Sequence, residues 1–270
     1  MLKTIYKDEY TKSRAQNNVT SIAFAGTVVG QLAFGYLSDH WSRRHSLLIS
    51  TIIIIVFSAL GAGSYGAGGS VQGLFAALTA YRFLLGIGIG GEYPAGSVAC
   101  AESTGELKKG HRNRWFIFFT NFAIDAGFVV AAFVPMIAVL IFTEKHLRAA
   151  WRLSLGLGIV PPLSLLYLRI KLREPEEYNR NKMHRTFYFL MAHQTIPSVL
   201  NADHPASVDY PYWLIIKFYW FRLIIVSLIW FIYDFSAYSF GIYSSSWLAF
   251  LLSADAPLWK SFGWNTCVDV

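Results

Sequence analysis

The chain has 270 residues, of which 54% are hydrophobic and 14% are charged. Soluble domains carry roughly 25% charged residues, so this composition favours a membrane protein over a soluble domain. The formal net charge of +7 would suggest a nucleic-acid partner in a soluble protein, but here most lysines and arginines stand between apolar runs. The two cysteines, Cys100 and Cys267, supply neither a disulfide framework nor the ligand spacing of a metal site.

Six apolar runs are long enough to cross a bilayer, which takes about 20 residues. They lie near residues 18–38, 46–65, 71–101, 115–142, 150–170 and 218–252. The sequence therefore predicts an all-α membrane protein with six transmembrane helices. A polar N-terminal segment (1–17) precedes a block of five helices (18–170), a cytoplasmic linker (171–217) leads to the sixth helix (218–252), and a tail (253–270) follows.

Basic residues are distributed unevenly between the polar connections. The loops at 40–45 and 102–114 and the long segment from Arg169 onward are rich in lysine and arginine, whereas the connection at 61–73 contains none. Loops enriched in these residues face the cytoplasm. We therefore place the basic set in the cytoplasm, which leaves the N-terminus of the chain on the outer side.

The stretch YRFLLGIGIGGEYPAGS (81–97) contains three glycines at the spacing G-x-G-x-x-G, which is the dinucleotide-binding fingerprint. They are Gly86, Gly88 and Gly91. A dinucleotide site needs a strand before the glycines and an acidic residue about 20 positions later. The glycines instead lie inside one long apolar run, and the later position holds His111. Small residues let membrane helices approach closely, so we interpret these glycines as a helix-packing surface.

Four ionisable side chains fall inside predicted spans, namely Arg82, Glu92, Asp125 and Asp234. A charge inside a membrane is costly and usually faces a cavity or a partner. Interhelical ion pairs are one interpretation, and a proton or substrate pathway is the one we favour. Arg82 precedes Glu92 by ten residues, roughly 15 Å along a helix, so these two side chains cannot pair directly within it.

The last span carries Trp230, Asp234 and Tyr238 at positions i, i+4 and i+8, which places them on one stripe of a helix. Such a stripe offers an indole N–H, a carboxylate and a phenol to a cavity. The alternative is ordinary packing or an interfacial aromatic belt. Asn121 and Asp125 form a weaker stripe of the same kind on the fourth span.

The short loop GYLSDHWSRRHS, at positions 35–46, is dense in charge. One interpretation is a positive-inside anchor. The other is a gating loop, in which Asp39 lies near a helix end and Arg43 or Arg44 reaches Glu102 at the end of the third span. Ion pairs of this kind form and break between the two states of a transporter.

These motifs resemble a known family. Gly35-x-x-x-Asp39, followed by Arg43 and Arg44, resembles the loop between helices two and three of major facilitator superfamily transporters. RFLLGIGIGGEYPAGS resembles the fourth helix, and WFIYDFSAY the seventh helix, of the phosphate:proton symporter branch. The opening KDEYTKSRAQNNVTSIAFAGTVVGQ, and Glu92 in place of Asp, are similar to the fungal glycerophosphoinositol permeases.

The resemblance implies roles for individual residues. The positions that match the lining of the phosphate-group site are Tyr93, Trp230, Asp234 and Tyr238. Glu92 and Asp234 match carboxylates implicated in proton coupling. Arg82 matches a widespread fourth-helix arginine, and Asp125 falls near a position where the phosphate symporters carry glutamine.

The resemblance also implies a fold. The six spans align with helices two to seven of a twelve-helix architecture, so helix one and nearly all of the C-terminal half are not in this sequence. The expected fold is thus an incomplete major facilitator fold. Alternating access rocks one half of such a protein against the other around a midplane site, and half of it lacks one wall of the cavity.

The expected function is proton-coupled transport of a glycerophosphodiester across the plasma membrane, with glycerophosphoinositol as the expected substrate. The partners are then a small anionic substrate, protons and the lipid bilayer, with no cofactor, no metal and no nucleic acid. A second hypothesis is a non-transporting remnant, or a membrane partner of a full-length permease. A third is a symporter of inorganic phosphate or another organic anion. We expect no enzyme, because the sequence presents no nucleophile–base cluster.

Overall fold

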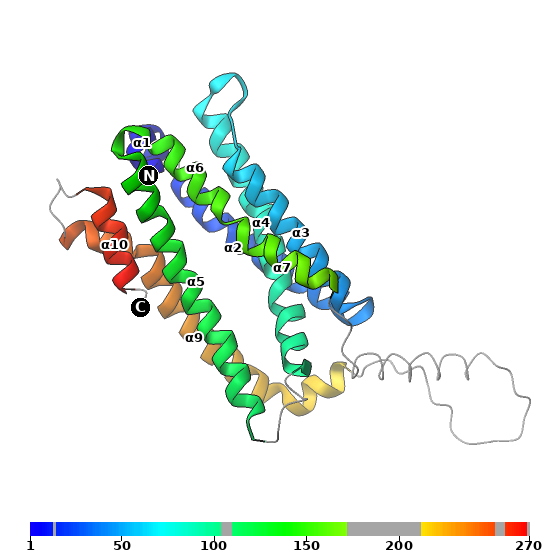
Figure 1. The fold of residues 1–270 in the computed structure, drawn as a ribbon. Coiled ribbons are helices and arrows are strands. Elements are labelled where there is room, and N and C mark those ends of the chain that lie inside the picture. Colours follow the sequence, from blue (N-terminus) through cyan, green and yellow to red (C-terminus); the bar gives the residue numbers. More distant parts are fainter. Residues whose placement is uncertain (13–14, 104–109, 172–211, 252–256, 269–270) are drawn as a thin grey trace, which may run out of the picture. The chain divides into compact units, whose positions relative to one another are not determined.

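The computed structural model describes residues 1–12, 15–103, 110–171, 212–251 and 257–268 (Figure 1). At some helical positions, among them Asp39 and Glu102, it describes the backbone alone. Most of the predicted linker at 171–217 therefore lies outside the described residues. The chain divides into two compact units, Met1–Arg180 with Asp255–Val270, and Asn181–Ala254.

The described residues form helices joined by short turns, as predicted, and no strand occurs among them. The helices are α1 (Leu2–Lys12), α2 (Ala15–His40), α3 (Arg43–Ala62), α4 (Val71–Ser103), α5 (Arg112–Phe142), α6 (Leu147–Leu157), α7 (Val160–Lys171), α9 (Tyr212–Leu251) and α10 (Leu258–Val268), with 3₁₀ turns η1 (Ala67–Gly69) and η3 (Glu144–His146).

Six stretches of the described helices are long and apolar enough to cross a membrane. They are Asn17–Ser38, Arg43–Ala62, Val71–Cys100, Arg114–Phe142, Leu147–Lys171 and Ile216–Ser239. Apolar helices of this length satisfy their backbone hydrogen bonds internally, which is the requirement for crossing hydrocarbon. The prediction of six membrane-spanning segments is confirmed at the level of length and composition.

The fifth predicted run, at 150–170, is not one continuous helix. It divides into α6 and α7, and the amides of Gly158 and Ile159 donate to carbonyl oxygens three residues back, at 3.2 and 3.0 Å. Pro161 and Pro162 follow the break as the second and third residues of α7. A proline lacks an N–H, so it is tolerated in the first turn of a helix and disrupts the interior. The proline pair therefore starts a new helix instead of kinking an old one.

A short turn connects α2 and α3 at the side that the sequence predicts to face the cytoplasm. Ser42 is the N-cap of α3, because its Oγ accepts a hydrogen bond from the amide of His45 at 3.2 Å. A serine at this position satisfies one of the free N–H groups at the start of a helix. The chain then returns through α3 and α4, so that α4 packs against α2 along one face and against α3 along another.

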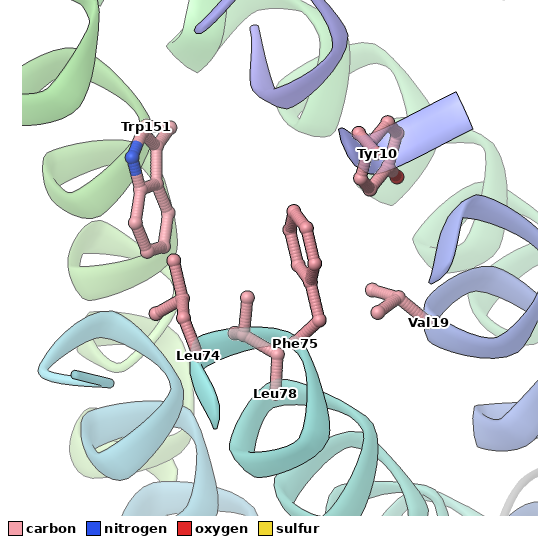
Figure 2. Packing of buried hydrophobic residues seen from close by; sticks show 6 residues of the cluster. All are labelled: Tyr10, Val19, Leu74, Phe75, Leu78 and Trp151. Atoms are coloured by element: carbon pink, nitrogen blue, oxygen red, sulfur yellow. The ribbon is translucent and has the colours of Figure 1, made fainter. Parts of the chain in front are cut away.

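The end of the first unit that the sequence predicts to be the outer one holds a cluster of buried apolar side chains, shown in Figure 2. Its members are Tyr10 of α1, Val19 of α2, Leu74, Phe75 and Leu78 of α4, and Trp151 of α6. The ring centroids of Tyr10 and Phe75 lie 5.3 Å apart. The polar N-terminal segment thus contributes a helix that packs on the ends of α4 and α6.

Candidate functional site

The glycines of α4 lie at points of close approach to two different helices. A Cβ atom at Gly86 would lie 2.2 Å from the carbonyl oxygen of Ala23 on α2, and one at Gly90 would lie 2.1 Å from that of Thr27. No real Cβ atom tolerates such distances, so only glycine fits at these positions. The interpretation of the glycine stretch as a helix-packing surface is borne out.

The other two glycines of the fingerprint face α3. A Cβ atom at Gly88 would lie 2.9 Å from Cγ2 of Ile53, and one at Gly91 would lie 3.0 Å from Cβ of Ser50. Gly91 also leaves room for the ring of Phe34 from α2. Because Gly91 brings α3 so close, the next residue of α4, Glu92, stands directly against the polar side chains of α3.

Glu92 forms an ion pair with Arg169 of α7. Nη2 of Arg169 donates to Oε2 at 2.5 Å, and Nη1 donates to Oε1 at 2.6 Å. Two parallel bonds of this kind between a guanidinium and a carboxylate are among the strongest hydrogen bonds in proteins. The side chain of Arg169 is 17% exposed, and that of Glu92 is 26% exposed. The pair therefore ties α7 to α4 from a largely buried position.

Two hydroxyl groups of α3 complete the cluster. Oγ of Ser50 donates to Oε1 of Glu92 at 2.6 Å, which is shorter than its alternative bond of 3.0 Å to the carbonyl oxygen of Leu47. Oγ1 of Thr51 donates to that same carbonyl oxygen at 2.6 Å and accepts from Nη1 of Arg169. Each hydroxyl has one proton to give, so Ser50 supports the carboxylate and Thr51 supports the guanidinium.

This ion pair bears on the two interpretations of the intramembrane charges. For Glu92, the interhelical ion pair is present. Its partner is Arg169, which the sequence analysis counted only as one of the basic residues at the cytoplasmic end of a span. A role of Glu92 in a proton pathway is not tested by this geometry and stays a prediction.

Arg82 lies in the part of α4 that faces Tyr10 of α1. Burial raises the pKa of Tyr10 above its usual value, and the positive charge of Arg82 acts on it in the opposite direction. Arg82 and Glu92 therefore belong to separate environments within α4, one at the outer cluster and one at the cluster of α3 and α7.

The gating loop is described only in part. Nη2 of Arg44 donates to the carbonyl oxygen of Ile170 on α7 at 2.6 Å, so this arginine contacts the end of α7. The side chains of Asp39 and Glu102 lie outside the described residues. The predicted pair between Glu102 and Arg43 or Arg44 stays a prediction.

The stripe on α9 belongs to the second unit. Trp230 is 56% exposed and its ring meets that of Tyr233 edge-on, with centroids 5.9 Å apart. Asp234 and Tyr238 are half-buried.

In the first unit, the remaining candidates lie largely at the surface. Tyr93 of α4 is 44% exposed, and Asn121 and Asp125 are exposed on α5. Among the described residues, no three His, Cys, Asp or Glu side chains lie close enough to hold a metal ion.

Sequence reasoning missed Arg169, Ser50 and Thr51. Arg169 counted only as one of the basic residues that mark the cytoplasmic side, and the two hydroxyls had no special spacing. The only signal was a charged residue inside the last turn of an apolar run, since polar side chains in such places usually have a partner. That signal does not name the partner.

The chain belongs to the family described as "Sugar (and other) transporter", whose model matches residues 1–186. This is a family of major facilitator proteins, and the chain is a multi-pass membrane protein and not an enzyme.

Among curated relatives, the chain is 50% identical over 265 residues to the major glycerophosphoinositol permease GIT3 of Candida albicans, a match that covers 98% of this chain and 45% of the relative. It is 48% identical to the glycerophosphocholine permease GIT4 of the same organism, covering 100% of this chain and 47% of that protein. The inorganic phosphate transporter 1-11 of Oryza sativa is 31% identical over 61% of this chain. The chain spans under half the length of the permeases it matches.

Solved structures support the fold. A D-xylose–proton symporter superposes with a TM-score of 0.65 over 93% of this chain and 54% of that chain, at 17% identity. The partially occluded, inward-open xylose transporter XylE of E. coli superposes with a TM-score of 0.56 over 65% of this chain and 43% of that chain, at 21% identity. The all-helical, partial major facilitator fold expected from the sequence is thus confirmed.

Proposed function

We propose that this chain forms part of a proton-coupled transporter of glycerophosphodiesters in the plasma membrane, with glycerophosphoinositol as the substrate. The observation that carries the proposal is the 50% identity, across 98% of the chain, to a permease named for glycerophosphoinositol. Identity to a plant phosphate transporter is 31% over 61% of the chain. This difference favours a phosphodiester over inorganic phosphate as the transported anion.

The proposed site residues divide into two groups. Tyr93, Trp230, Asp234 and Tyr238 contact the phosphate group of the substrate, through hydroxyl, indole and carboxyl groups. Glu92 and Asp234 take up the coupled proton, with Arg82 and Asp125 as further charged groups of the pathway. Neutralising a carboxylate lowers the cost of bringing an anionic phosphodiester into a cavity of low dielectric, because two like charges in one such cavity repel strongly.

The loop residues Gly35, Asp39, Arg43, Arg44 and Glu102 are proposed to hold the cytoplasmic ends of the helices in one of the two access states. Support for this role comes from the bond of Arg44 to the end of α7. A connection of this kind opens and closes as packed helices slide past one another.

The test is uptake of labelled glycerophosphoinositol at acidic and neutral pH. The host is a yeast strain that lacks its own glycerophosphodiester permeases and expresses the tagged chain. We expect uptake that rises with acidity and that is lost in Asp234→Asn. Ser236→Ala is the matched control, because Ser236 is exposed on the same helix two residues away. Full proton-driven uptake by Asp234→Asn would contradict the role of that carboxylate.

Two results would favour the alternatives. Absence of uptake, with the chain intact in the membrane, would favour a non-transporting remnant or a partner of a full-length permease. Co-expression with such a permease then separates these two, since only a partner changes the uptake of the permease. Equal competition by inorganic phosphate would favour a phosphate or general organic-anion symporter.

A further inference from the structure

The cluster around Glu92 contains a residue that the proposed function does not use. Arg169 binds both oxygens of the carboxylate, and its Nη1 lies 3.2 Å from the carbonyl oxygen of Leu47 on α3. It stands in the last turn of α7, where a cation is also favoured by the helix dipole. One guanidinium thus contacts α3 and α4 from a third helix.

The groups that contact the carboxylate come from two helices. From α3 they are the hydroxyls of Ser50 and Thr51, at 2.6 and 3.5 Å from Oε1, and from α7 it is the guanidinium of Arg169. From α2, the apolar ring of Phe34 lies beside Gly91.

The other ionisable residues on these helices are Tyr36, Asp39 and His40 on α2, Arg43, Arg44 and His45 on α3, and Tyr167 and Lys171 on α7. On α5, Asp125 is exposed. Among the described side chains, Arg169 is therefore the cation in direct contact with Glu92.

We propose that Arg169 is a positioning residue for Glu92. It holds the ionised carboxylate against α3 and sets how readily that carboxylate takes up a proton. When the carboxylate is protonated, the ion pair between the two side chains is lost. The proposal rests on the proposed role of Glu92 in proton coupling.

A nearby positive charge favours the ionised form of a carboxylate, and two donated bonds favour it further. Proton uptake removes the negative charge and converts one oxygen into a donor. The bidentate pair then ends, whereas the bonds from Arg169 to Leu47 and Thr51 and the bond from Arg44 to Ile170 still hold the end of α7 to α3. Protonation of Glu92 is in this way linked to how firmly the end of α7 is attached to α4.

The test is an infrared titration of the full chain purified in lipid. The carbonyl stretch of a protonated carboxyl group is followed as the pH is lowered, and the band that Glu92→Gln removes is assigned to Glu92. In Arg169→Gln we expect the midpoint of this band to move to higher pH by roughly one to three units, the usual effect of losing an opposite charge at contact distance.

Lys171→Gln is the matched control, because it removes the same charge from the same turn of α7. Lys171 is exposed and donates its hydrogen bond to Tyr167. Its midpoint is expected to match that of the unmodified chain. Arg169→Lys is expected to be intermediate, since lysine keeps the charge but cannot donate two parallel bonds. It also keeps the test decisive if Arg169→Gln does not fold.

An unchanged midpoint in Arg169→Gln, or in Arg169→Lys if only that variant folds, would overturn the proposal. A shift in Lys171→Gln as large as in Arg169→Gln would also overturn it, because the effect would then be a general one of charge. Because the readout needs no transport, it is separate from the proposed function. Normal proton-driven uptake by Glu92→Gln would refute the coupling role of Glu92, and the titration would still decide whether Arg169 controls its protonation.

Discussion

The face of α4 that meets α2 and the face that meets α3 are built from the same six residues, 86–91, yet they are held together in different ways. On the α2 side, Gly86 and Gly90 bring the two backbones together without any charged group. On the α3 side, Gly88 and Gly91 make room for a polar cluster that includes Glu92 and draws in α7. In lipid, close van der Waals contact and interhelical hydrogen bonds both drive association, and α4 uses one on each face.

The difference indicates how each face tolerates change. Added side-chain volume is expected to destabilise the α2 face, because a backbone oxygen cannot move aside. The α3 face fails when charge is unbalanced, because the remaining partner is left in a largely buried position. Three substitutions test this contrast and a fourth tests the outer end of α4, in order from the largest expected effect to the smallest.

Gly90→Ala is expected to have the largest effect. Its Cβ would lie 2.1 Å from the carbonyl oxygen of Thr27, so α2 and α4 must separate, at a cost of about 3 kcal/mol for overpacking. The measurement is the thermal unfolding midpoint of the chain in detergent. Gly96→Ala is the control on the same helix, since nothing lies within 4 Å of its Cβ position. Equal midpoints for the two variants would contradict the steric account of the α2 face.

Arg169→Ala is expected to cost about 2 kcal/mol, the usual worth of charge-assisted hydrogen bonds, because Glu92 loses both bonds from the guanidinium. The double variant Arg169→Ala, Glu92→Ala should recover part of this loss, since no unpaired charge remains. The measurement is a double-mutant cycle on the free energy of unfolding. A coupling energy of zero would show that the pair does not stabilise the α3 face.

Ser50→Ala is expected to cost about 1 kcal/mol, because one hydrogen bond to the carboxylate is lost while the ion pair stays. Ser97→Ala serves as the control, since the hydroxyl of Ser97 is exposed and bonds only within α4, to the carbonyl oxygen of Pro94. The unfolding midpoint again gives the comparison. A larger loss in Ser97→Ala than in Ser50→Ala would argue against a structural role for the hydroxyl at position 50.

Tyr10 gives the smallest predicted effect and tests the outer end of α4. Burial raises its pKa above the ordinary value of 10.0. The stability that this group contributes is therefore fully present below pH 10.0 and is lost as the pH rises through the higher pKa of the folded state. Unfolding midpoints between neutral and strongly alkaline pH should fall more steeply for the unmodified chain than for Tyr10→Phe. Parallel slopes would count against the burial of this phenol.

Several elements of the fold were readable from the residues alone. Runs of apolar residues of sufficient length predicted six spans, because hydrocarbon excludes any backbone that does not bond to itself. Glycines inside such a run predicted close helix contact, and the contacts at Gly86 and Gly90 have that form.

The break between α6 and α7 was only partly readable. Pro161 and Pro162 marked a disturbance within the run at 150–170, but a proline pair inside a membrane helix produces either a kink or a new start. Which of the two occurs depends on whether the residues before the pair form i→i+3 bonds, as Gly158 and Ile159 do with the carbonyls of Leu155 and Gly156.

The sequence by itself determined the class of the protein, the number of spans and the cost of placing Glu92 inside one of them. Only the tertiary structure decided that this cost is met by Arg169, which is 77 positions away along the chain. The physical reason is that hydropathy and glycine spacing act within a single helix and leave a periodic trace in it. An ion pair between helices depends on their rotation and depth relative to each other, and these are set by the contacts of α2, α3, α4 and α7 together.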